Sequence, residues 1–228
     1  MSVYFISGID TDIGKSIAVG MMARYLHQFG VKVITMKLVQ TGNDGFSEDL
    51  NKHRSMMNVA PFPEDAEGLT APQIFSFPAS PHLAASLEKR TLDLDAIRRA
   101  VAELAKRYEV VLLEGAGGLA VPLNEELLTV DFVSELGSAL ILVTSGRLGS
   151  LNHTILSLEA AKNRGIAVAG VIYNRYPAAD PIIDADSPRM IRKYLKRYRM
   201  PEAIVELPEI KEPYVNVDFS PIFGDKTK

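Results

Sequence analysis

The feature that most constrains the fold lies near the start of the chain, where the segment Gly8-Ile-Asp-Thr-Asp-Ile-Gly-Lys-Ser16 joins an apolar run to a helical pattern. The apolar run covers residues 3–7, and the helical pattern begins near Ile17. A strand, a glycine-bounded turn ending in Gly-Lys-Ser and a helix are together typical of a phosphate-binding loop. Backbone N–H groups of such a turn and of the helix start converge on an anion.

The side chains at the end of this segment suit nucleotide chemistry. Lys15 adds a mobile positive charge for the outer phosphates, and the Ser16 hydroxyl can bind Mg²⁺. Five residues separate Gly8 from Gly14, one more than in the usual loop. The alternative is that Gly-Lys-Ser is only a turn and an N-cap. Because the flanking strand and helix patterns agree with a phosphate loop, the sequence favours nucleoside triphosphate binding.

The bulk composition excludes several classes of protein. The chain has 228 residues, 47% of them hydrophobic and 23% charged, which is ordinary for a soluble globular protein. Its net charge of −3 argues against nucleic acid or an anionic membrane as the main partner. With no cysteine, disulfides and thiolate chemistry are excluded. Neither a signal peptide nor a run of 18 apolar residues is evident, so we expect a cytoplasmic protein.

The rest of the chain alternates strand and helix patterns. Apolar strand patterns recur at residues 31–36, 110–113, 139–143, 166–173 and 203–207, with helical patterns between them. Such alternation predicts an α/β fold of the P-loop NTPase type, with a mostly parallel sheet covered by helices on both faces. We expect one domain over residues 1–228, of which residues 209–228 are tail-like.

Two Ser-Pro pairs indicate helix starts. Ser80-Pro81 predicts a short helix to Leu87, because proline suits the first helical position. Ser187-Pro188 predicts the start of a basic helix that continues to Arg199. We interpret its charges as a solvated face, since the whole protein is acidic.

Polar residues follow several predicted strands at the edge where open α/β sheets bind ligands. Lys37 ends the second strand, Glu114 ends the apolar strand at 110–113 and precedes small residues, and Asn174 ends another strand. Each has a simpler interpretation: a solvated lysine, an incidental glutamate in a turn, and an asparagine that turns the chain. Because parallel strands bring these positions to one edge, we expect them to converge with the phosphate loop.

Local pattern leaves two residues of the irregular segment 43–73 open. Asp49 precedes a plausible short helix and is either a metal-directed carboxylate or, more simply, a helix cap. His53 fits a surface or packing histidine better than a ligand.

Five motifs in order resemble dethiobiotin synthetase. These are Gly8–Ser16 with its wide spacing, Met36-Lys-Leu-Val-Gln-Thr-Gly42, Ser80-Pro-His82, Leu113-Glu-Gly-Ala-Gly-Gly118 with Val121-Pro-Leu123, and Leu148-Gly-Ser-Leu-Asn-His153. The resemblance extends from the N-terminus to about Pro208.

The resemblance implies an ATP-dependent, C–N bond-forming ligase of biotin biosynthesis. Its substrates would be 7,8-diaminononanoate, carbon dioxide and MgATP, and its product dethiobiotin. One amine would capture carbon dioxide as a carbamate, whose oxygen attacks the γ-phosphorus to give a carbamic–phosphoric anhydride. The second amine would then close the ring and expel phosphate.

The resemblance also assigns site residues. Lys37, Thr11 and Lys15 would be catalytic, and Ser16, Asp49 and Glu114 would bind Mg²⁺. The substrate would contact Thr41 and, from a partner subunit of a homodimer, Gly149, Ser150, Leu151 and Asn152. The ATP-binding residues would be Asp12, Ile13, Gly14, Lys15, Ser16, Ile17, Asp49, Glu114, Gly115, Ala116, Gly117, Asn174, Arg175, Leu207 and Pro208.

Three residues depart from the family pattern. Asp12 stands where glutamate is frequent, Leu38 where proline is usual, and Arg175 where aspartate commonly follows the asparagine. A displacement of about 1 Å can cost roughly a hundredfold in rate, so Asp12 could weaken catalysis. A lost carboxylate at position 175 predicts turnover with other nucleoside triphosphates.

Two other classes share this fold. A dimeric partitioning-type ATPase switch usually carries an extra lysine early in the phosphate loop, but no lysine lies between Gly8 and Gly14. A synthetase linked to an amidotransferase needs a cysteine nucleophile in a partner or second domain, and this chain contains no cysteine.

Overall fold

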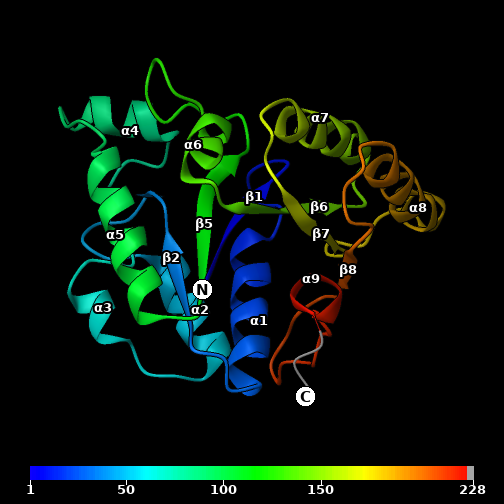
Figure 1. Ribbon diagram of the computed structural model, residues 1–228, viewed down its shortest axis with the longest axis horizontal. Coiled ribbons are helices and arrows are strands. Elements are labelled where there is room, and N and C mark those ends of the chain that lie inside the picture. Colours follow the sequence, from blue (N-terminus) through cyan, green and yellow to red (C-terminus); the bar gives the residue numbers. More distant parts are fainter. Residues whose placement is uncertain (225–228) are drawn as a thin grey trace.

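The computed structural model describes residues 1–224 (Figure 1). Within that range a six-stranded parallel sheet has the order β2-β5-β1-β6-β7-β8. Its strands are β1 (Ser2–Gly8), β2 (Val33–Lys37), β5 (Val110–Gly118), β6 (Ala139–Ser145), β7 (Val168–Asn174) and β8 (Ile204–Leu207). The predicted α/β fold with a parallel sheet is therefore confirmed.

Nine helices and a small second sheet complete the described part of the chain. The helices are α1 (Lys15–Gln28), α2 (Glu48–Met57), α3 (Pro63–Ala66), α4 (Pro81–Leu87), α5 (Leu94–Arg107), α6 (Thr129–Leu136), α7 (Ser150–Asn163), α8 (Pro181–Arg197) and α9 (Ser220–Phe223). The second sheet pairs β3 (Gln40–Thr41) with β4 (Ile74–Phe75) in parallel, and no local pattern predicts these two short strands.

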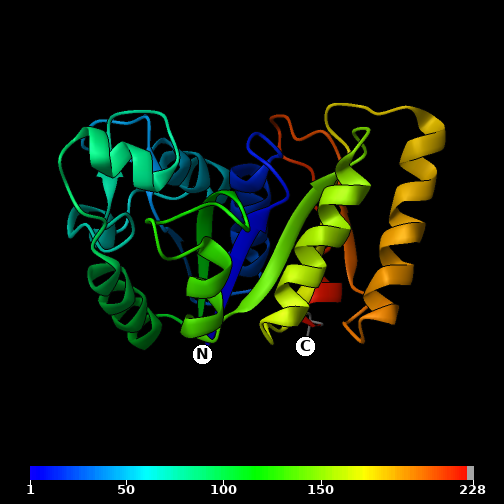
Figure 2. The same cartoon turned by 90° about the horizontal axis from the view of Figure 1, so that it is seen from above.

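Both faces of the large sheet are buried because side chains of each strand alternate between them. In β5, Val111 and Leu113 join the core formed with α4 to α8, whereas Val110 and Leu112 join the core formed with α1 and α2. Figure 2 shows α1 behind the sheet and α6 and α7 in front of it. The unbroken apolar run at residues 110–113 is thus explained by helices on both sides.

The parallel register brings the carboxyl ends of the strands to one edge. Gly8 of β1 pairs with Gly118 and Val143, and Lys37 of β2 pairs with Glu114 of β5. The phosphate loop, Lys37 and Glu114 therefore begin from neighbouring strands, as the sequence predicts. Among residues 1–224, no helix combines the length and apolar character that a bilayer crossing requires.

The basic helix begins earlier than the Ser187-Pro188 pattern predicts. It is α8, which starts at Pro181 with Asp180 as its N-cap: the Asp180 carboxylate accepts from the amides of Ile182 and Ile183. Pro188 lies inside the helix, so the predicted start was wrong by seven residues. The cap at Asp180 and the proline at the first position outweigh the second proline signal.

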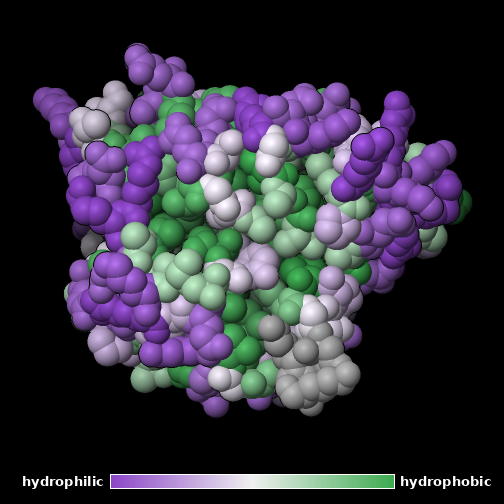
Figure 3. All heavy atoms as spheres, in the orientation of Figure 1, coloured by the Kyte–Doolittle hydropathy of each residue, from purple (hydrophilic) through white to green (hydrophobic). Residues whose placement is uncertain are grey.

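The outer side of α8 is hydrophilic in the space-filling view (Figure 3). Its basic residues are all exposed, which agrees with a solvated face. They are Arg189, Arg192, Lys193, Lys196, Arg197 and, just after the helix, Arg199.

Residues 209–224 pack on the core, although the sequence pattern is tail-like. Phe219 is fully buried and its ring lies 5.6 Å from that of Tyr25 on α1. Phe223 packs edge-on against Tyr4 of β1 at 5.2 Å. These two aromatic rings, four residues apart, cover apolar surface of α1 and β1 and hold this segment against the core. Residues 225–228 lie outside the described part of the chain.

Candidate functional site

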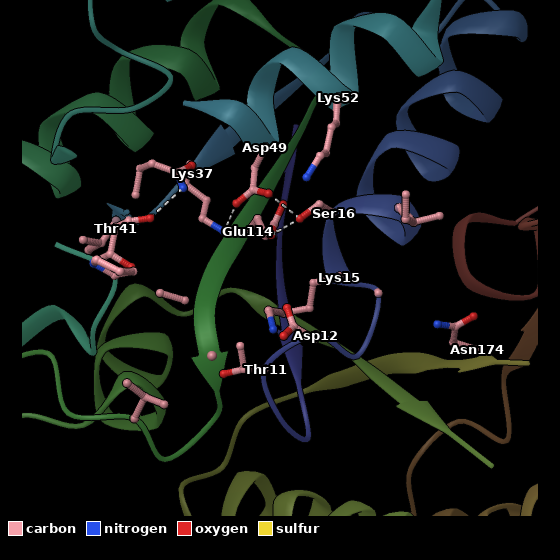
Figure 4. A pocket seen from close by; sticks show the side chains of 18 of the residues that line it. Thr11, Asp12, Lys15, Ser16, Lys37, Thr41, Asp49, Lys52, Glu114 and Asn174 are labelled. Carbon is pink, nitrogen blue, oxygen red and sulfur yellow. Dashed lines mark hydrogen bonds and ion pairs between the residues drawn. The ribbon is translucent and has the colours of Figure 1, made fainter. Parts of the chain in front are cut away.

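A cavity of about 1010 Å³ lies at the carboxyl edge of the sheet. It extends from the loop after β2, past the phosphate loop, to the segment after β8, and Figure 4 shows its central residues. The predicted site residues that line it are Thr11, Asp12, Gly14, Lys15, Ser16, Ile17, Lys37, Thr41, Asp49, Glu114, Ala116, Gly117, Asn174 and Pro208.

The phosphate loop takes a conformation that its sequence explains. Gly14 has a φ of +92° directly before α1, and Asp12 has a φ of 54°. Glycine adopts such angles at no steric cost, and aspartate tolerates them better than most residues. The Nζ atom of Lys15 donates to the carbonyl of Asp10 at 3.0 Å, so it folds back along the loop. Burial lowers the pKa of Lys15, and Glu114 partly opposes that shift.

Ser16 and two carboxylates form the centre of the site (Figure 4). The Ser16 Oγ atom lies 2.7 Å from Oδ1 of Asp49 and 2.9 Å from Oε1 of Glu114. These residues come from α1, α2 and β5, so tertiary structure alone brings them together. Asp49 does not cap α2, because Ser47 accepts the amide of Leu50 in that role.

Lys37 joins the same carboxylates from β2. Its Nζ atom lies 2.6 Å from Oδ2 of Asp49, 2.8 Å from Oε1 of Glu114 and 3.3 Å from the carbonyl of Gly115. Burial opposes the charge of each partner, but the mutual attraction is stronger. The pKa of Lys37 is raised and that of Glu114 lies well below its usual value. Lys37 and Glu114 are therefore both ionised at neutral pH.

These donors fit a hard divalent cation. Mg²⁺ prefers oxygen ligands and usually takes one or two carboxylates, completing its shell with substrate phosphates and water. Asp49, Glu114 and Ser16 offer two carboxylates and a hydroxyl beside the phosphate loop. In the described part of the chain, no group of three or more His, Asp or Glu side chains is placed to hold a metal ion.

Asn174 contacts the phosphate loop. Its Nδ2 atom donates to the carbonyl of Ile13 at 3.0 Å, and its Oδ1 accepts from the amide of Tyr176. The amide thus ties the end of β7 to the loop while lining the cavity.

Some predicted site residues lie outside the cavity. Ile13 and Leu207 are buried, and the Arg175 side chain turns to Glu206 and Asp184. Gly115 touches the site through the carbonyl that accepts from Lys37. Residues 149–152 begin α7 and do not line the cavity of their own chain. In that segment Gly149 and Asn152 are exposed, and the preceding Leu148 is 90% exposed.

Several residues that line the cavity were not predicted from the sequence. Lys52 lies three residues after Asp49 and His53 four residues after it, so both share its side of α2. Lys52 lines the cavity beside Asp49, whereas His53 is fully buried behind it. That helical spacing was a usable signal. Residues Tyr176, Pro177, Glu209, Ile210 and Lys211 also line the cavity, and no local pattern marks them.

Leu38 and Asp12, two of the three departures from the family pattern, fit the backbone at their positions. Leu38 is fully buried and its amide donates to the Glu114 carbonyl at 2.8 Å, a bond that proline could not make. Asp12 occupies the left-handed conformation already described. Both residues therefore suit the local backbone.

Comparisons with known proteins add family evidence. A family model described as an AAA domain matches residues 2–212. ATP-dependent dethiobiotin synthetase BioD 2 of Pasteurella multocida is 47% identical over 208 residues, covering 91% of this chain and 97% of that protein. ATP-dependent dethiobiotin synthetase BioD of Chlorobaculum tepidum is 50% identical over 203 residues, covering 89% and 85%.

Solved structures show the same fold at low identity. A ParA family ATPase from Chlorobium tepidum has a TM-score of 0.54 at 16% identity, with 93% of this chain and 86% of that chain covered. Chloroplast FtsY from Physcomitrella patens has a TM-score of 0.54 at 18% identity, with 99% and 64% covered. At such identities the likeness is one of fold alone.

Proposed function

Since this chain belongs to the ATP-dependent dethiobiotin synthetase family, a family of ligases in biotin synthesis, we propose that it carboxylates 7,8-diaminononanoate and closes the ureido ring, using carbon dioxide and MgATP. The observation that carries the proposal is the buried Lys37 cation. It lies between the phosphate loop and Thr41, within 2.8 Å of two carboxylates that fit Mg²⁺. Two anions, the carbamate and the transferring phosphoryl group, must meet at such a cation.

The chemistry proceeds in three steps. One substrate amine adds to carbon dioxide and loses a proton, which gives a carbamate. The carbamate oxygen attacks the γ-phosphorus, and ADP leaves. The second amine attacks the carbamoyl carbon of the mixed anhydride, phosphate leaves, and the amine proton is lost to solvent as the ring closes.

This chain supplies positive charge and hydrogen-bond donors for those steps. Lys37 holds the carbamate oxygens, and Lys15 and the loop amides hold the outer phosphates, where charge develops during transfer. Thr11, which belongs to the phosphate loop and lines the cavity, would act near the phosphates, and Thr41 would contact the diamine. Mg²⁺, held by Ser16, Asp49 and Glu114, would neutralise charge on the β- and γ-phosphates.

We also propose a homodimer in which the start of α7 serves the partner's site. Residues 149–152 lie outside their own cavity, and Leu148 beside them is almost fully exposed. Free N–H groups of the first turn of a helix favour an anion, so this turn would bind the substrate carboxylate. Light scattering of the protein at micromolar concentration measures its mass in solution. A monomeric mass would contradict this arrangement.

The base subsite supports a broad nucleotide preference. The guanidinium of Arg175 is paired with Glu206 and Asp184, so no carboxylate stands at that position to accept from an adenine amino group. We expect turnover with GTP and CTP within about tenfold of that with ATP, equivalent to about 1.4 kcal/mol. A nucleotide-swap assay that finds a strict requirement for ATP contradicts this expectation.

The central experiment measures phosphate release with bicarbonate and Mg²⁺, with and without the diamine. For the native chain we expect release that needs the diamine and yields the cyclic urea by mass spectrometry. Lys37→Ala should abolish both. Lys106→Ala removes a 74% exposed lysine from α5 and should retain full activity. Release that is independent of the diamine and of Lys37 would move the function to the nucleotide-switch class.

A further inference from the structure

His53 is a fully buried histidine that the reaction itself does not use. It lies on α2 one turn after Asp49, on the side of the helix that faces β2 and β5. Its Nε2 atom lies 3.0 Å from Oε2 of Glu114. Within residues 1–224 neither atom makes a hydrogen bond of standard geometry, so this 3.0 Å ion-pair contact is the polar interaction that the structure gives each of them.

The two oxygens of Glu114 therefore face different surroundings. Oε1 contacts Ser16 and Lys37 on the cavity side, at 2.9 and 2.8 Å. Oε2 points into the core, where its neighbour is the fully buried side chain of His53. An ionised carboxylate can only accept hydrogen bonds, so a 3.0 Å contact is favourable when Nε2 carries the proton. Rotation of the carboxylate would exchange a paired oxygen for an unpaired one.

A chain of hydrogen bonds fixes the other side of the imidazole. The Nδ1 atom of His53 lies 3.0 Å from Oγ1 of Thr35, which is fully buried on β2. Arg54 donates to the same Thr35 oxygen at 2.6 Å and pairs with Asp65 at 2.7 Å. Since arginine can only donate, the single Thr35 proton is free for Nδ1, which leaves the Nε2 proton for Glu114.

We propose that His53 is a positioning residue that holds Oε2 of Glu114 in the core and thereby keeps Oε1 directed at Ser16, where the cation of the nucleotide complex binds. The inference rests on the proposed function, because it assumes that Glu114 is a metal ligand. Partners behind a ligand typically change metal affinity or activity by about 10–100-fold when they are removed. His53 would supply that support from α2, the helix that also carries Asp49.

Two amide substitutions distinguish positioning from mere packing. His53→Gln places an amide nitrogen near the position of Nε2 and can still donate to Glu114. His53→Asn is one methylene shorter, so its amide reaches the position of Nδ1 beside Thr35 but leaves Glu114 without a donor. Both are polar, uncharged and similar in volume, so a purely structural role predicts similar behaviour.

The experiment measures the affinity of each variant for Mn²⁺ in the presence of ADP. The free Mn²⁺ is quantified by electron paramagnetic resonance, so the assay requires no turnover. We expect His53→Asn to weaken binding by about 10–100-fold and His53→Gln to stay within about threefold of the native chain. Met57→Ala is the control for lost stability, because it removes another buried side chain of α2. It should leave Mn²⁺ binding unchanged.

Glu114→Gln distinguishes a failure of the positioning role of His53 from a failure of the proposed metal site. Weakened Mn²⁺ binding in Glu114→Gln together with equal binding in the two His53 variants would overturn the positioning role and leave the proposed function intact. Unchanged binding in Glu114→Gln would instead remove Glu114 from the metal site, and the proposed function would need revision first. Reduced binding in Met57→Ala equal to that in His53→Asn would also overturn the inference, because stability alone would explain both.

Discussion

Lys37→Ala should destabilise the protein as well as abolish its activity. Nζ of Lys37 lies 2.6 Å from Asp49 and 2.8 Å from Glu114, and the Lys37 side chain is only 6% exposed. At an effective dielectric constant of 20, two unit charges 2.8 Å apart attract by about 6 kcal/mol. Much of that attraction offsets the cost of burying the charges. Breaking a buried pair on one side costs about 3–5 kcal/mol, because the remaining charge stays buried without its partner.

That loss should appear as a large fall in melting temperature. For a protein of 150–250 residues, 1 kcal/mol corresponds to about 2–4 °C, so we expect a fall of roughly 6–20 °C. Lys106→Ala, an exposed lysine in an i,i+3 pair, should shift the melting temperature by less than about 2 °C. Calorimetry of both variants without nucleotide or Mg²⁺ gives the comparison.

Added Mg²⁺ should restore stability to Lys37→Ala but not activity. With the lysine gone, Asp49 and Glu114 are free to bind the ion, and saturation at 100 times the dissociation constant stabilises by about 2.7 kcal/mol. In the native chain Lys37 occupies the same oxygens, so Mg²⁺ alone should stabilise it less. The electrostatic explanation would be refuted if Lys37→Ala had the same melting temperature as Lys106→Ala and if added Mg²⁺ did not raise it.

Three further changes test other parts of the structure. Gly14→Ala should weaken binding of a fluorescent nucleotide at least tenfold, because Gly14 has a φ of +92° and an added Cβ would lie 2.5 Å from Nδ2 of Asn174. Phe219→Ala should cost about 3–5 kcal/mol in urea unfolding, since the ring is fully buried. Burial favours the neutral form of Asp65, but hydrogen bonds from Arg54 hold its pKa below the ordinary value of 3.8. The ionised carboxylate therefore contributes to stability above pH 3.8, and that contribution is lost as the pH falls below this value. Asp65→Asn should therefore lower the unfolding free energy by about 2 kcal/mol at pH 6 and show a smaller further loss at pH 3 than the native chain, measured by urea titration.

The proposed family chemistry depends on cations that the fold must keep ionised in a buried place. Lys37 achieves this through two carboxylates, and its pKa is raised despite burial. Lys15 has no comparable partner, since its Nζ donates to a backbone carbonyl, and burial lowers its pKa. The phosphates of the bound nucleotide would restore the balance at Lys15, so it is suited to bind substrate anions.

The sheet was predictable because its strands carry local signals. Apolar runs such as residues 110–113 fit buried parallel strands, and glycine and proline mark the turns between elements. Errors arose where two signals competed. Both Pro181 and Pro188 are good helix starts, and only the cap at Asp180 decides between them.

By itself the sequence determined the alternation of strands and helices, the phosphate loop and the edge at which Lys37 and Glu114 would meet, because those depend on short-range periodicity and on the fixed direction of parallel strands. Only the tertiary structure decided which side chains Asp49 and His53 contact. Both lie on α2, and nothing near them in the sequence contains the partners, Ser16, Lys37 and Glu114, which lie 12 or more residues away. Their roles as a carboxylate at the cavity and a histidine behind it follow from how α2 packs on the sheet, which local pattern does not encode.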